Sequence, residues 1–176
     1  ELLLGIGECV RRVLADLGIL LREQGNLNEA TDMFNDGLNV ARSVGNQAAV
    51  ATILGELGET LRRQGDIGQA RAYLTDALLN ARAVHDVANE MTFLLWLGRL
   101  TTDVGEYDDA VIFLESGLVT SRSTGARSRE CEFHIALSRL HDIRGDIGTA
   151  FEHFRKGTEL REELLGSEQR QAGGKI

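Results

Sequence analysis

The 176-residue sequence contains no proline. Proline locks φ and removes a backbone hydrogen-bond donor, so its absence leaves nothing to interrupt a long helix. Aromatic residues are also scarce, at 5% of the chain. Both features favour an all-α protein.

The chain also lacks most signs of an oxidising compartment, a membrane or a nucleic-acid partner. Its two cysteines, Cys9 and Cys131, are too few for a disulfide framework. No apolar run approaches the ~20 residues that a membrane span needs, and the arginines of the opening segment follow its apolar residues, unlike a secretory signal. The net charge of -8 argues against binding to nucleic acid or anionic lipid. We therefore expect a cytoplasmic protein with no membrane and no direct nucleic-acid partner.

A repeat of forty residues organises what is present. The skeleton of residues 54–81 also occurs forty residues earlier, forty later and, in a weaker copy, eighty later. Each copy has a turn glycine, at Gly25, Gly65, Gly105 and Gly145. A small residue stands seven positions before each turn, at Gly18, Gly58, Gly98 and Ser138. A fixed repeat that cannot bury its own apolar face alone is typical of a stacked solenoid.

Each copy holds two apolar patterns of helical period, which predict a helical hairpin. Glycine in the first turn can close a helix in the left-handed conformation, and Asn26, Asp66 and Asp146 are placed to cap the next helix. We expect one domain over residues 1–166, followed by a frayed or truncated tail over 167–176. The expected units are about 7–46, 47–86, 87–126 and 127–166. The expected helices are at about 4–24, 27–44, 47–64, 67–84, 87–104, 107–124, 127–144 and 147–165.

These residues resemble the tetratricopeptide repeat, in which Leu-x2-Leu-Gly-x2-Leu is followed by Ala-x3-Phe or Ala-x3-Leu. The resemblance implies an α-solenoid, a right-handed superhelix of four antiparallel helix pairs, with small residues where the helices of a pair approach. It also implies a protein–protein interaction scaffold whose concave groove binds a peptide or helix of a partner. The repeat is 40 residues rather than 34 and lacks the closing proline. The long form is similar to repeats of bacterial regulators, so the alternative is a sensory or regulatory segment of a larger signalling protein, acting by ligand binding or self-association.

By analogy with that family, residues of the first helices that are not needed for packing face the partner. The predicted partner-binding residues are Asp16, Ile19, Glu56, Glu59, Arg62, Arg63, Leu95, Trp96, Arg99 and Arg139. In the fourth copy, Glu132, Ile135 and Asp142 are on the same face. Ile19, Glu59, Arg99 and Arg139 occupy one position of successive copies and should form a ladder, and Trp96 is a residue type common at binding hot spots. The alternatives are that Glu56, Glu59, Arg62 and Arg63 pair with one another along the helix, and that Trp96 packs between repeats.

We predict no catalytic site, metal or cofactor, because the sequence shows no phosphate-binding loop and no strand-borne nucleophile. Cys131, His134, His141 and His153 fall on neighbouring helices, but buried, hydrogen-bonded histidines are the simpler interpretation. The C-terminal face around Phe151, Phe154 and Leu164 is a possible site of homo-oligomer formation.

Overall fold

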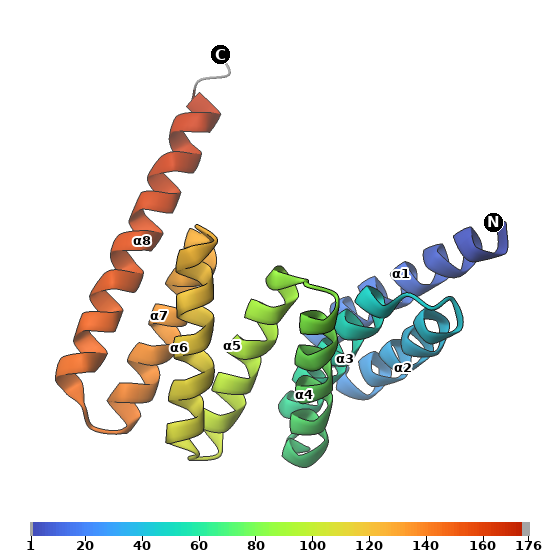
Figure 1. Ribbon diagram of the computed structural model, residues 1–176, viewed down its shortest axis with the longest axis horizontal. Helices are drawn as coiled ribbons and strands as arrows, with labels where there is room; N and C mark the ends of the chain where they lie inside the picture. The colour runs from blue at the N-terminus through green and yellow to red at the C-terminus, as the bar shows by residue number, and fades with distance from the viewer. Residues whose placement is uncertain (1, 174–176) are drawn as a thin grey trace. The chain divides into compact units, whose positions relative to one another are not determined.

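The computed structural model describes the backbone of residues 2–173 and the side chains of residues 5–167. The described residues form eight α-helices and no strand, in chain order (Figure 1). They are α1 (Leu2–Glu23), α2 (Leu27–Ser43), α3 (Gln47–Gln64), α4 (Ile67–Ala83), α5 (Val87–Asp103), α6 (Tyr107–Ser123), α7 (Arg127–Ile143) and α8 (Ile147–Gly173). The all-α prediction is confirmed, and so is its pattern of helix pairs joined by short turns. None of these helices combines the length and the apolar character that crossing a membrane requires.

Helix α8 extends beyond the end that the sequence predicted for the last helix, about residue 165. It continues to Gly173, so residues 167–173 are helical where the sequence predicted a frayed tail. Gly166 does not stop the helix because no turn motif follows it, and the next residues are mostly good helix formers. Residues 174–176 lie outside the described residues.

The turn glycines have the conformation that the sequence predicted. Gly65 has φ of +87°, and the amide of Asp66 donates to the carbonyl of Leu61. Equivalent positive φ values occur at Gly25, Gly105 and Gly145. This arrangement satisfies carbonyl groups at the end of the helix.

The predicted caps are confirmed only in part. Asp66 Oδ1 accepts from the amide of Gln69 at 3.1 Å, and Asp146 Oδ1 accepts from that of Thr149 at 3.2 Å. Asn26, in contrast, makes no capping hydrogen bond through its side chain. The prediction for Asn26 is therefore wrong.

The chain groups into two compact units, Glu1–Trp96 and Leu97–Ile176. The division falls inside α5, and each unit is described by itself. In the first unit α1 packs on α2, α2 on α3, and α3 on α4; in the second, α6 packs on α7 and α7 on α8. The single domain over residues 1–166 stays a prediction.

Candidate functional site

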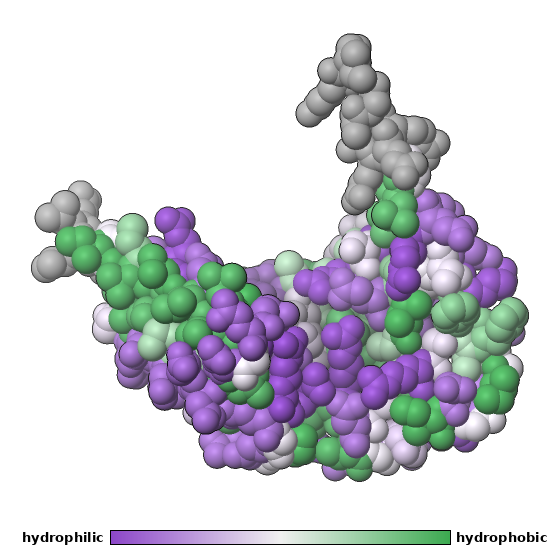
Figure 2. All heavy atoms as spheres, turned by 180° about the vertical axis from the view of Figure 1, so that it is seen from behind, coloured by the Kyte–Doolittle hydropathy of each residue, from purple (hydrophilic) through white to green (hydrophobic). Residues whose placement is uncertain are grey.

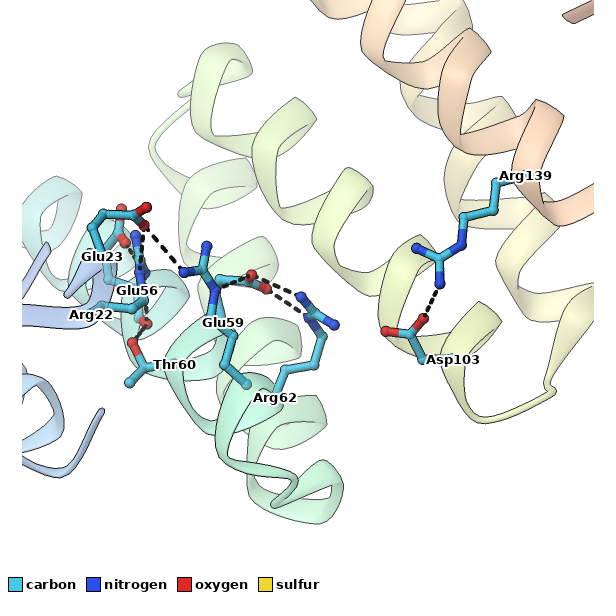
Figure 3. A network of polar contacts seen from close by, with 9 residues as sticks. Arg22, Glu23, Glu56, Glu59, Thr60, Arg62, Asp103 and Arg139 are labelled. Carbon is cyan, nitrogen blue, oxygen red and sulfur yellow. Dashed lines mark hydrogen bonds and ion pairs between the residues drawn. The ribbon is translucent and has the colours of Figure 1, made fainter. Parts of the chain in front are cut away.

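A network of charged side chains covers the first helices of the first unit (Figure 3). Arg22 of α1 donates from Nη1 to Oε2 of Glu56 on α3 at 2.5 Å, and both side chains are largely buried. Burial raises the pKa of Glu56, against the opposing effect of the Arg22 charge. Arg22 also lies over the ring of Phe34, with its Cζ 5.8 Å from the ring centroid. These contacts fasten α1 to α3.

Glu59 is the second centre of this network. Arg62 donates to both carboxylate oxygens of Glu59, at 2.8 and 3.0 Å, and Arg63 donates to one of them at 3.1 Å. Arg63 also reaches Glu23 of α1 at 3.2 Å. Burial alone would raise the pKa of Glu59, but the hydrogen bonds and charges of the two arginines outweigh it and lower the pKa.

The pairing along one helix, considered as an alternative for this set, is therefore confirmed for Glu59, Arg62 and Arg63. It is wrong for Glu56, whose partner is Arg22 on another helix. The two arginines already hold a carboxylate of their own chain, and Glu59 is buried. Of the remaining predicted residues in α1, Asp16 is exposed and Ile19 is partly exposed.

The two apolar residues predicted in α5 differ from each other. Leu95 is 1% exposed, so its side chain cannot reach a partner, and its inclusion in the predicted site is wrong. Trp96 is partly exposed, with its ring centroid 5.9 Å from that of Phe93. Phe93 in turn fills the space over Gly55, where an added Cβ would lie 2.0 Å from the ring. Trp96 keeps part of its surface open.

Arg99 and Arg139 lie in the second unit. Arg139 is exposed and donates to Asp103 at 3.3 Å. The two arginines border different hollows along α7, described below. The ladder that would join them to Ile19 and Glu59 stays a prediction.

Two hollows follow one face of α7 in the second unit. The first, the arginine hollow, has a volume of about 320 Å³ and is lined by Arg99, Ser128, Cys131, Glu132, Ile135, Arg161 and Leu164. The second, the phenylalanine hollow, has a volume of about 410 Å³ and is lined by Ile135, Ser138, Arg139, Asp142, Ile147, Ala150, Phe151 and Phe154. Ile135 borders both. Ser128, Glu132, Ile135, Arg139 and Asp142 recur every three or four residues, so they share one side of the helix.

Beside the phenylalanine hollow, the fourth repeat packs differently from the other three. An added Cβ on Gly98 would lie 2.4 Å from Leu114, which is fully buried against it. Gly18 and Gly58 receive Phe34 and Leu74 in the same way. The equivalent pair in the fourth repeat is Ser138 and Phe154, and Phe154 is 52% exposed.

Ser138 carries the Cβ that the glycines lack. Helices α7 and α8 nevertheless pack closely, as the small residue at this position predicted. Phe154 and Phe151 are both exposed, and both line the hollow. From the sequence, these two residues were predicted as a self-assembly face. Arg161 was not predicted as a site residue, although a charged residue where the other copies have alanine or serine was a signal.

Three histidines of the fourth repeat form a connected cluster. His134 is 1% exposed; its Nε2 lies 3.0 Å from Nη2 of Arg122 and its Nδ1 lies 2.9 Å from Nδ1 of His153. The ring of His141 stacks on that of His153, 5.7 Å away. Burial, with the charges of His153 and Arg122, lowers the pKa of His134 to about 4. The prediction of buried, hydrogen-bonded histidines is confirmed for His134.

Cys131, considered with these histidines as a metal ligand, donates instead to the carbonyl of Gly157 at 3.1 Å. Within the described part of the chain, no three His, Cys, Asp or Glu side chains are grouped so as to hold a metal ion.

Comparisons with known proteins agree with this repeat architecture. The tetratricopeptide repeat family matches residues 9–83 by sequence. A comparison with curated proteins found no match. Among solved structures, BtubC (BKLC) from P. vanneervenii is similar with a TM-score of 0.79 and 18% identity, over 91% of this chain and 66% of its own.

Two further structures share the fold. A Podosopora anserina protein described as a putative kinesin light chain with nearly identical TPR-like repeats has a TM-score of 0.68 and 14% identity, over 88% of this chain and 76% of its own. Aspartyl phosphate phosphatase F from Bacillus subtilis has a TM-score of 0.66 and 12% identity, over 86% of this chain and 49% of its own. The chain thus spans just under two thirds of BtubC and about half of the phosphatase. Residues 9–83 therefore match the tetratricopeptide repeat family by sequence, and the chain shares its fold with solved helical-repeat proteins.

Proposed function

We propose that the chain is a protein-binding scaffold that takes a peptide or helix of a partner along the α7 face of its second unit. The observation that carries this proposal is the pair of hollows that meet at Ile135. They extend along α7 from Ser128 to Asp142, a distance of about 21 Å at the rise of an α-helix. This length suits about four turns of a bound helix or a shorter extended peptide.

The linings of the hollows define the chemistry of the partner. Arg99 and Arg161 give the arginine hollow two cationic groups against the single carboxylate of Glu132. A carboxylate side chain of the partner fits there by charge-assisted hydrogen bonds. Exposed Phe151 and Phe154 suit an apolar side chain one or two helical turns away. We therefore infer a ligand segment with an acidic residue at one end and an apolar residue at the other.

Peptide selection tests this function directly. The immobilised chain is used to select from a random peptide library, and the affinity of an enriched peptide is measured by fluorescence anisotropy. We expect enriched peptides to combine acidic and apolar residues and to bind more weakly at high salt. Arg161→Glu and Phe151→Ala should each weaken binding by about tenfold or more, since both remove a central contact.

The matched control is Ile112→Ala, because Ile112 is as exposed as Phe151 but lies on α6 outside both hollows. Its affinity for the peptide should not change. The proposal is wrong if the library yields no enriched peptide, or if the enriched peptides bind equally well to all three variants. Trp96→Ala tests the groove predicted from the sequence in the same assay, and Arg99→Glu tests both sites, because Arg99 also lines the arginine hollow.

A second candidate is a regulatory segment of a longer signalling protein. The similarity to aspartyl phosphate phosphatase F, of which this chain spans 49%, favours it. The reading frame around the segment tests this candidate: a cyclase, kinase or DNA-binding sequence beyond Ile176 supports it, and a stop codon there argues against it. Self-association through Phe151 and Phe154 would use the same hollow, so a bound peptide should compete with it.

A further inference from the structure

Helix α1 exposes a stripe of large apolar side chains. The α1 stripe consists of Ile6, Val10, Val13, Leu17 and Leu20, all classed as exposed. In Figure 2, hydrophobic residues gather over α1. The residues are spaced by four, three, four and three positions, which places them in one line along the helix. This is the spacing of a seam between two helices that pack side by side.

The repeat identifies what kind of element this face receives. Forty residues after Val10, Val13 and Leu17 come Val50, Ile53 and Leu57 of α3, which are all buried. An added Cβ on Gly37 of α2 would lie 3.5 Å from Ile53, so this face of α3 packs against α2. Because a short turn joins them, α2 and α3 run in opposite directions. The same face of α1 is thus shaped for an antiparallel helix.

We propose that two copies of the chain associate by packing their α1 stripes against each other in antiparallel orientation. A two-fold axis near Val13 would place Val13 against its own copy, Val10 against Leu17, and Ile6 against Leu20. The Val13 contact then lies at the axis and occurs once, and each of the other two contacts occurs twice, as a symmetric dimer interface requires. The stripe is self-complementary in this orientation because its spacing is nearly the same read from either end.

The charged residues beside the stripe fit the same arrangement. Arg12 and Asp16 are both exposed and lie four residues apart on one flank of the stripe. In the antiparallel pair, Arg12 of one copy faces Asp16 of the other, and the reverse pairing also forms. In a parallel two-fold pair this flank would face the opposite flank of the partner, so Arg12 and Asp16 would not meet, and the pairing of opposite charges favours the antiparallel dimer.

Sedimentation velocity over a dilution series of the 176-residue chain tests the proposal. We expect a concentration-dependent equilibrium between monomer and dimer. Val13→Glu places two carboxylates against each other at the axis and should raise the dissociation constant of the dimer by about tenfold or more. Since Val13 is 63% exposed in the single chain, the variant should keep the helical circular dichroism of the original.

Ile112→Glu is the matched control, because Ile112 is 64% exposed and lies on α6. It should leave the dissociation constant unchanged. A monomer at every concentration overturns the proposal. A dimer that survives Val13→Glu as well as it survives Ile112→Glu overturns it too, because association then uses another face.

Disulfide trapping tests the orientation. In a Cys9→Ser background, Val13→Cys places one thiol on each side of the axis, and mild oxidation should link two chains covalently. The same substitution at Ile112 should not. The charge reversal Arg12→Asp should weaken the dimer, and adding Asp16→Arg should restore it; failure of both the linkage and the restoration excludes the antiparallel pair.

Discussion

Nη1 of Arg22 lies 2.5 Å from Oε2 of Glu56 and joins α1 to α3 in a largely dehydrated setting. The two partners differ in what they can do when the other is removed. A guanidinium stays charged at any pH at which the protein folds, whereas a carboxylate can bind a proton. Replacing Arg22 and replacing Glu56 should therefore lower the free energy of unfolding by different amounts.

Glu56→Ala should lower the free energy of unfolding by about 3 kcal/mol, because it leaves a buried arginine with only the exposed carboxylate of Glu23, 3.7 Å from its Nε. Arg22→Met should cost less, since Glu56, whose pKa burial already raises, can become neutral. The loss of unfolding free energy in Arg22→Met should become smaller as the pH is lowered. A carboxyl group whose pKa is raised by folding destabilises the folded protein only as the pH rises through that pKa. Urea unfolding at pH 7 and pH 5 measures both effects.

Glu23→Ala serves as the control for this comparison. Glu23 contacts the same network from an exposed position, so its removal should cost less than about 1 kcal/mol. Equal costs for Glu56→Ala and Arg22→Met at pH 5 would contradict the argument.

The predicted helix caps give a second test. Asp66 accepts from the backbone and the side-chain amide of Gln69, at 3.1 and 2.7 Å, and Asp66→Ala should cost about 1 kcal/mol of unfolding free energy. Asn26 occupies the same place in the first copy without a side-chain capping bond. Asn26→Ala should therefore cost clearly less, and thermal unfolding of the two variants checks the difference. A larger loss for Asn26→Ala would show that its side chain does cap α2.

Features that repeat along the sequence could be predicted, because every copy reports the same constraint. The period located all eight helices, and the need for a left-handed turn identified Gly65 and its equivalents. Contacts that depend on how two helices meet could not be predicted in this way. Arg22 and Glu56 are 34 residues apart, and no spacing rule selects Glu56 over the adjacent Glu23 or over Glu59.

The candidate site was harder to predict for the same reason. Leu95 and Trp96 are neighbours in the sequence, yet one is buried and the other partly open. Phe34, Leu74 and Leu114 are buried, yet Phe154 at the same position of the last copy is 52% exposed. The repeat pattern alone therefore does not determine burial in the last copy.

The close approach at the helix-crossing glycines predicts the effect of a methyl group. Gly98→Ala should destabilise the protein by about 2 kcal/mol, because the added Cβ would lie 2.4 Å from Leu114, a side chain buried too tightly to move aside. Gly68 lies in α4, where the nearest contact of an added Cβ would be Oδ1 of Asp66 at 3.9 Å. Gly68→Ala should stabilise the protein by up to about 1 kcal/mol through helix propensity. Urea unfolding gives both values, and the opposite signs are the decisive observation.

The histidine cluster predicts how stability depends on pH. Because a guanidinium only donates, Nε2 of His134 accepts from Arg122, and the proton of the neutral ring is on Nδ1, where it faces His153. Protonating His134 would break this chain of hydrogen bonds and add a charge among Arg122, His153 and Lys156, against the single nearby carboxylate of Glu130. Burial, with the charge of His141, also lowers the pKa of His153, against the opposing effect of Glu115.

The sign follows from the lowered pKa. Between pH 6.5 and pH 4 the unfolded chain binds more protons than the folded one. The free energy of unfolding should therefore decrease as the pH is lowered, by up to about 3 kcal/mol for His134. His134→Leu restores the leucine of the other copies and should reduce this slope, while Arg122 keeps its ion pair with Glu130 at 2.9 Å. His85→Gln, which removes an exposed histidine outside this cluster, is the control variant. Urea unfolding at half-unit pH steps measures the three slopes, and an unaltered slope in His134→Leu would assign the pH dependence to other groups.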